Sequence, residues 1–143
     1  MPRIADPTKA KPVRSIVSVW ENPNGWMIAI KLRRVRRDEQ PFVLNGMISP
    51  QFNRSLYKAI DQILPNAAVT CGYGTDEAIL QMNVGRDLIA GMLETDRNDH
   101  ELESKLIEYL KPFEKDFEDI ETMIRTYLDE NAAYINDWRR VIA

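Results

Sequence analysis

The sequence predicts an α+β fold, in which N-terminal antiparallel β-hairpins and one packed helix precede a long C-terminal helical segment. Apolar residues alternate with a period of two in residues 16–32 and again in 78–84, which is typical of half-buried strands. In residues 106–127 they recur at spacings of three and four, which is typical of tightly packed helices. We therefore divide the chain into a basic mobile arm (1–13), an α+β domain (14–97) and C-terminal helices (98–143) packed on that domain or on a partner chain.

The first hairpin is predicted from "SIVSVW", "ENPNG" and "WMIAIKLRR", which read as a strand, a turn and a return strand. If Trp20 lies opposite Trp26, the two faces of the hairpin follow from the period of two. One face then carries Ile16, Trp20, Trp26, Ile28, Ile30 and Leu32, and the other carries Val17, Val19, Met27 and Ala29. Both faces are apolar near the turn, so we expect cover on each side.

The next elements are predicted from a capping pattern and a second alternation. "FVLNGMI" (42–48) is compatible with a third strand, and Ser49 followed by Pro50 is typical of a helix start. The helix carries Phe52, Leu56, Ile60 and Ile63 at helical spacing, and Pro65 closes it. Residues 66–74 and 77–84 then predict a second hairpin with a short helix near 86–94, although a single helix from Thr75 onward also fits the pattern.

The C-terminal segment combines an apolar seam with an acidic face. Pro112 lies inside the seam without changing its phase, so we expect a kink or two abutting helices there. The seam consists of Leu106, Leu110, Phe113, Phe117, Ile120, Ile124 and Tyr127, and the acidic face of Glu114, Asp116, Glu118, Asp119 and Glu121. Tyr134, Trp138 and Val141 extend the amphipathic pattern toward the end of the chain.

Charge is distributed unevenly along a chain whose net charge is -3. Residues 1–37 carry nine basic and two acidic side chains, whereas the remainder carries ten basic and twenty acidic ones. This asymmetry bears on partners and on electrostatic steering. No apolar run approaches the ~20 residues of a membrane helix, no secretory signal is recognisable, and Cys71 has no second cysteine to pair with. We therefore expect a cytoplasmic protein without a membrane partner.

Four features that resemble chemical sites have simpler structural explanations. His100 stands among acids but lacks the spacing of a metal motif, and Cys71 is the type of residue most often buried in a core. The glycines of "GYGTDE" suit a tight turn better than a phosphate loop. The acids between Glu94 and Glu130 crowd a helical surface and not a sheltered cleft. We expect no catalytic residue, no metal, no cofactor and no enzymatic activity.

Two functional hypotheses remain. The first is a small non-enzymatic regulator, inhibitor or assembly factor that binds a basic or nucleic-acid-binding protein surface through its acidic face, and that forms a homodimer through its seam. The alternative is a nucleic-acid-binding protein that uses the basic arm and the arginines of "KLRRVRR", namely Arg33, Arg34, Arg36 and Arg37. Because nothing in the sequence encodes base readout, we expect these arginines to pair with an acidic protein surface.

Overall fold

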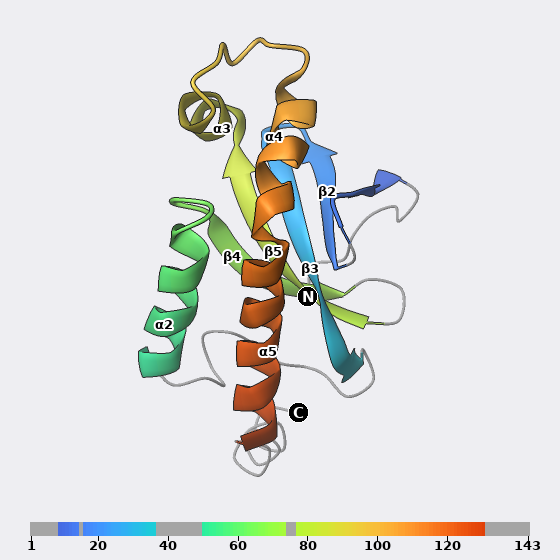
Figure 1. The fold of residues 1–143 in the computed structure, drawn as a ribbon, viewed down its shortest axis with the longest axis vertical. Helices are drawn as coiled ribbons and strands as arrows, with labels where there is room; N and C mark the ends of the chain where they lie inside the picture. Colours follow the sequence, from blue (N-terminus) through green and yellow to red (C-terminus); the bar gives the residue numbers. More distant parts are fainter. Residues whose placement is uncertain (1–8, 15, 37–49, 74–76, 131–143) are drawn as a thin grey trace.

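The computed structural model describes residues 9–14, 16–36, 50–73 and 77–130, and these confirm the α+β class (Figure 1). The elements are, in chain order, β1 (Lys11–Pro12), β2 (Val17–Asn22), β3 (Gly25–Arg36), α2 (Pro50–Asp61), β4 (Ala68–Tyr73), β5 (Glu77–Gly85), α3 (Arg86–Met92), α4 (Leu102–Leu110), the 3-10 turn η3 (Lys111–Phe113) and α5 (Glu114–Glu130). The predicted strand 42–48 and the Ser49 cap lie outside the described residues.

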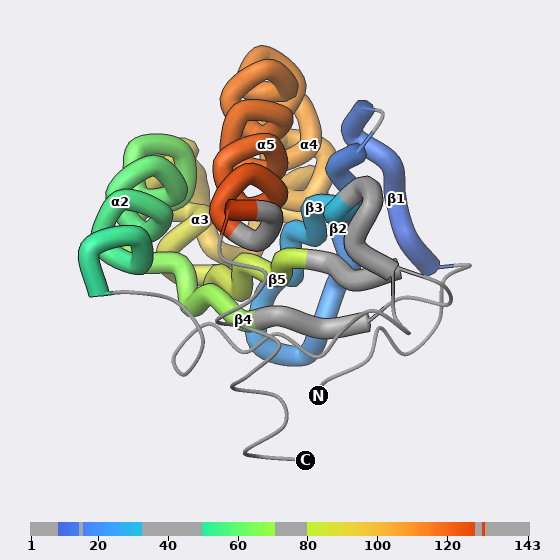
Figure 2. Tube along the Cα trace, turned by 90° about the horizontal axis from the view of Figure 1, so that it is seen from below, coloured from blue at the N-terminus to red at the C-terminus, as the bar shows by residue number. Residues whose placement is uncertain are grey.

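The strands form one antiparallel sheet in the order β1-β2-β3-β5-β4, with the helices on one of its faces (Figure 2). α5 packs across β3, the long central strand. The side chains between sheet and helices make up a single apolar core, whose largest fully buried members include Trp26, Phe117, Ile28, Ile30, Leu32, Leu56, Leu80 and Met82. The fold is therefore a two-layer arrangement in which the helices cover one face of the sheet.

The first hairpin exists, but its register differs by one residue from the prediction. Glu21 lies opposite Trp26, and Trp20 lies opposite Met27. The loop is only two residues long, because the Asn22 side chain accepts a hydrogen bond from the Asn24 backbone N–H at 3.0 Å and closes a tight turn. The one-residue shift moves Trp20 away from the helices and brings Val17 and Val19, which the prediction set on the opposite face, into the core.

The middle of the chain follows the prediction closely. α2 begins at Pro50, the expected first helical position, and buries Leu56 and Ile60. β4 and β5 pair as a hairpin, and α3 follows directly from β5. The alternative of one helix from Thr75 onward is therefore wrong.

The C-terminal helices abut at Pro112, as predicted. η3 separates α4 from α5 and contains this proline. Leu106, Leu110, Phe117, Ile120 and Ile124 from the predicted seam are buried in the core of the same chain, whereas Phe113 and Tyr127 are half-buried. The seam thus covers the sheet of its own chain, so it no longer supports the homodimer, which stays a prediction based on the apolar hairpin faces.

The end of the predicted mobile arm takes part in the fold. Lys11 and Pro12 pair with β2 at the edge of the sheet, and Val13 joins the apolar core. Of these three residues of the predicted arm, only Val13 is buried, whereas Lys11 and Pro12 stay exposed on the edge strand. Residues 1–8 lie outside the described part of the chain.

Candidate functional site

The acids predicted as one face of the C-terminal helix lie on two flanks of α5. Successive residues of a helix are rotated by about 100°, so residues spaced by three or four form rows along it. The rows flank the buried stripe of Phe117, Ile120 and Ile124 on opposite sides. One row is Glu114, Glu118, Glu121 and Arg125, and the other is Asp116, Asp119 and Met123.

In the first row, Glu114, Glu121 and Arg125 form contacts within the chain. The Glu114 carboxylate lies 3.8 Å from the Arg14 guanidinium, which belongs to the basic N-terminal segment. Glu121 is 0% exposed, and Arg125 Nη1 donates to its carboxylate at 3.3 Å. Glu121 therefore does not belong to an exposed face and cannot reach a partner, which corrects the prediction for this residue. Glu118 is half-exposed on the same flank.

The second row lines a groove of about 320 Å³ between α2 and α5. Its floor is apolar, and Asp116 and Asp119 are exposed carboxylates on the α5 side. The lining residues are Ala59, Gln62, Ile63, Phe113, Asp116, Asp119, Ile120 and Met123. The groove thus brings two of the predicted partner-binding acids next to apolar surface.

Contacts of aromatic side chains tie α2 and the turn after it to the C-terminal helices at two places. Phe52 of α2 stacks on Tyr127 of α5, with ring centroids 4.1 Å apart. At the other place, Tyr109 of α4 packs against Phe113 of η3 with ring centroids 5.2 Å apart, and its hydroxyl donates to the carbonyl of Ile63, just after α2, at 2.7 Å. Burial raises the pKa of the Tyr109 hydroxyl, so it stays protonated as a donor at neutral pH. These fixed contacts define the groove before any partner arrives.

The two groove carboxylates differ in their surroundings. Asp119 pairs with Lys115 one turn away, with the nitrogen and oxygen 3.4 Å apart and the side chains 85% and 65% exposed for Lys115 and Asp119. Such exposed pairs are worth at most about 1 kcal/mol, so an incoming cation can replace Lys115. Among the described residues, Asp116 forms no ion pair. Within the described part of the chain, the groove therefore offers one carboxylate without an ion pair, Asp116, and one whose exposed partner a cation can replace, Asp119.

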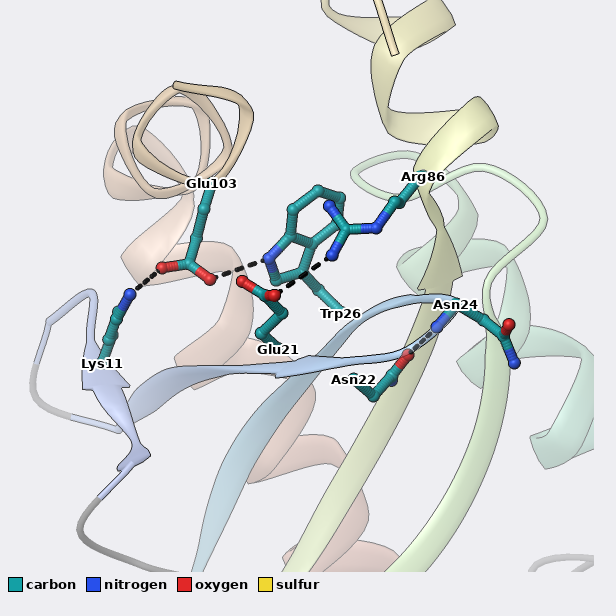
Figure 3. A network of polar contacts seen from close by, with 7 residues as sticks. All are labelled: Lys11, Glu21, Asn22, Asn24, Trp26, Arg86 and Glu103. Atoms are coloured by element: carbon teal, nitrogen blue, oxygen red, sulfur yellow. Dashed lines mark hydrogen bonds and ion pairs between the residues drawn. The ribbon is translucent and has the colours of Figure 1, made fainter. Parts of the chain in front are cut away.

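A second polar cluster lies at the end of the sheet where β2 turns into β3 (Figure 3). Trp26 is 1% exposed, and its indole Nε1 donates to Glu103 of α4 at 3.0 Å. Glu103 also pairs with Lys11 of β1. Arg86 stacks its guanidinium 4.7 Å above the Trp26 ring and donates to Glu21 at 3.2 Å. Every polar group of this cluster is used to join β1, β2, β3, α3 and α4, so we interpret it as structural.

Lowering the pH should weaken the contribution of Glu103 to stability. Burial by itself raises the pKa of Glu103, but the hydrogen bonds from Lys11 and Trp26 outweigh it and bring the pKa below its ordinary value of 4.5. A carboxyl group with a lowered folded-state pKa stabilises the fold fully above its unfolded-state pKa, and this stabilisation is lost as the pH falls through the folded-state pKa.

Urea unfolding of wild type and Glu103→Gln tests this expectation. At pH 7 the variant should be less stable by about 1 kcal/mol, because glutamine keeps an acceptor for Trp26 but loses the charge facing Lys11. The difference should shrink as the pH falls below 4.5. A difference that stays constant from neutral to acid pH would show that the charge of Glu103 contributes nothing.

The residues around His100 serve the connection between α3 and α4. Asp99 accepts hydrogen bonds from the Glu101 backbone N–H at 2.8 Å and from the Thr95 hydroxyl at 2.8 Å, and it pairs with Lys105. The ammonium group of Lys105 holds the pKa of Asp99 far below its usual range, with help from these two donors. His100 itself is exposed. No group of three or more potential metal ligands occurs among the residues that the structure describes.

The other residues singled out in the sequence, namely Cys71, the "GYGTDE" turn and the arginines of residues 33–37, lie partly outside the described residues. Cys71 lies in β4, as predicted, and the "GYGTDE" turn includes residues 74–76, which are not described. β3 continues through Arg36, whose backbone is opposite Glu77 after a register shift that begins at Lys31. The side chains of Arg33, Arg34 and Arg36, and the whole of Arg37, lie outside the described residues. The pairing of these arginines with acidic groups and the alternative of nucleic-acid binding therefore both stay predictions.

The fold and the groove together define a small α+β protein with an apolar, acid-rimmed surface groove. In the described part of the chain, no helix has the length and apolar character needed to cross a membrane. No family model, curated protein or solved structure matches the chain at a significant level. The groove is therefore the feature of this chain that bears on its function.

Sequence reasoning identified the acids of the groove but missed the groove itself. The missing half is the end of α2 and the turn that follows it, where Ala59, Gln62 and Ile63 line the groove. The available signal was a second apolar flank, formed by Ala59 of α2 and by Ile63 just after it, beside the buried Leu56 and Ile60. Pairing this flank with Asp116 and Asp119 required knowing that α2 packs beside α5.

Proposed function

We propose that this protein is a non-enzymatic regulator, inhibitor or assembly factor that binds a basic surface of another protein through the groove between α2 and α5. The observation that carries the proposal is the position of Asp116 and Asp119 beside the apolar lining of the groove. Protein interfaces combine an apolar centre with a polar rim, and this groove has both.

The charge layout supports a basic partner. Lys11 and Arg14 of the basic N-terminal segment lie against Glu103 and Glu114, so part of the positive charge is neutralised within the fold. The carboxylates at the groove are left facing solvent. Negative charge there attracts a cationic partner and repels phosphate, which favours protein over nucleic acid at this surface. A homodimer and a cytoplasmic location stay predictions of the sequence.

Reversing the charge at the groove should weaken partner binding. We expect Asp116→Lys/Asp119→Lys to weaken the affinity for the natural partner at least about tenfold, because two attractive rim charges become repulsive. The partner is identified by affinity capture with the wild type followed by mass spectrometry. Its dissociation constant is then measured by calorimetry with purified wild type and variant.

Glu108→Lys/Glu130→Lys is the matched control, because it makes the same change in net charge at exposed positions that do not line the groove. It should bind the partner with nearly the wild-type affinity. Equal weakening by both variants would mean that only the overall charge matters. An unchanged affinity in the groove variant would refute the proposed contact surface, and capture of nucleic acid in place of protein would favour the alternative hypothesis.

A further inference from the structure

We propose that the partner segment received by the groove is a basic amphipathic helix, with one or two apolar side chains in the groove and a Lys or Arg one turn away on Asp116 or Asp119. This inference rests on the proposed function and adds the conformation and residue pattern of the partner. It follows from the size of the groove, the nature of its walls and the spacing of its charges.

The size of the groove suits a few side chains. At about 320 Å³ it lies at the lower end of the range of about 300–1,000 Å³ that small-molecule sites occupy. Ile63 and Ile120 are buried in its floor, while Phe113 and Met123 are half-buried and leave apolar surface accessible. The flexible thioether of Met123 can adapt to an aliphatic or aromatic anchor. An apolar side chain of a partner therefore gains burial here at little cost.

The walls of the groove favour a helix over an extended peptide. An extended peptide that binds by strand addition gains its affinity from backbone hydrogen bonds to an open strand edge. The walls of this groove come from the end of α2 with the turn after it, and from η3 and α5, so no strand edge in the described part of the chain lines it. A helix needs no backbone partners and inserts side chains from one face, so it fits between two helices by side-chain packing.

The spacing of the charges matches the same geometry. Asp116 and Asp119 are three residues apart on α5, which sets their side chains one turn apart. On a partner helix, an apolar residue at position i and a basic residue at i+3 or i+4 also lie one turn apart on one face. Asp116 has no ion-pair partner in the described part of the chain, and the pair of Asp119 with Lys115 is exposed. Both carboxylates can therefore receive a cation beside the anchored side chain.

A peptide titration monitored by the methyl resonance of Met123 tests the inference directly. The probe is a capped, alanine-based peptide of about 15 residues, long enough to form some helix, with Leu at i and i+4 and Arg at i+3 and i+7. One matched peptide replaces Leu by Ser, and another replaces Arg by Glu. The full chain is labelled at its methionine methyl groups, and the buried Met82 in the core serves as internal control.

The Leu/Arg peptide should shift Met123 saturably and leave Met82 unmoved, with an affinity that falls as salt is added. Each matched peptide should bind roughly tenfold more weakly, or about 1.4 kcal/mol. Failure of every peptide to move the Met123 resonance would overturn the inference, as would equal binding of all three.

The same resonance identifies other occupants of the groove. A Met123 resonance that changes with protein concentration alone would identify a second copy as the occupant. A change caused by Arg139→Glu/Arg140→Glu without peptide would identify the chain's own C-terminal segment, and either result would overturn an external helix.

Groove-filling variants separate this inference from the proposed function. Ala59→Phe fills the groove without changing its charge, and Gln62→Phe does so from the exposed rim if the first variant does not fold. Each variant should prevent the peptide from shifting the Met123 resonance. Each should also lower the affinity for the natural partner at least about tenfold. A further result is that the natural partner fails to bind Asp116→Lys/Asp119→Lys and still binds a folded filling variant. That result would leave the proposed function standing and refute insertion into the groove.

Discussion

Replacing Phe117 by Ala should lower the free energy of unfolding by about 3–5 kcal/mol. Phe117 is 0% exposed and belongs to α5, which crosses β3 at the centre of the sheet. Removing its ring deletes apolar contacts and leaves a cavity between the two layers, because the surrounding helix and strands can close only part of the space. Urea unfolding followed by circular dichroism should show a lower midpoint with an unchanged slope.

The dependence of this loss on protein concentration shows whether the predicted seam packs within one chain or forms a dimer interface. Since Phe117 is buried within its own chain, the loss should be the same at low and high protein concentration. Phe113→Ala is the matched control, because this ring is only half-buried and should cost clearly less. A loss for Phe117→Ala that grows with dilution would contradict the intramolecular packing and return the seam to a dimer interface.

The first hairpin shows how far alternation alone can predict a sheet. The period of two placed both strands correctly, but "ENPNG" permits either a two-residue or a longer loop. The choice depends on the Asn22 side chain closing the turn onto the Asn24 backbone N–H. A loop of the wrong length shifts the register by one, which moved Trp20 to the wrong face. Local turn chemistry therefore decided what the pattern of apolar residues left open.

The acids of α5 show a different limit of the sequence. Crowding of five acids into eight positions predicted one acidic face, although about 100° of rotation per residue distributes them over two flanks. Helical geometry alone could have separated the two rows. The fate of each row depends on neighbours distant in sequence, since Arg14 approaches Glu114, whereas α2 approaches Asp116 and Asp119. A local sequence pattern does not predict which distant segments pack against a helix.

Gly25→Ala and Gly91→Ala should change stability in opposite directions. A Cβ atom on Gly25 would lie 2.1 Å from the Val84 carbonyl oxygen and 2.8 Å from the Gly85 Cα. Both are backbone atoms of the paired strand β5, so the overlap cannot be relieved by turning a side chain. The strands would have to separate where β3 begins, next to the tight turn and to Trp26. We expect a loss of about 3 kcal/mol, the upper part of the range for an added methyl group in a packed site.

Gly91 provides the control, because it is exposed in α3 and a Cβ atom there meets nothing within 4 Å. Alanine restricts the unfolded chain and favours the helix, so Gly91→Ala should stabilise the protein by about 0.5 kcal/mol. Thermal and urea unfolding of both variants measure the contrast. If Gly25→Ala unfolded at the wild-type midpoint, the close approach of β3 and β5 would be disproved. Because the same substitution is made at both sites, any difference in sign must come from the space around the new methyl group and from the local backbone, and not from the chemistry of alanine.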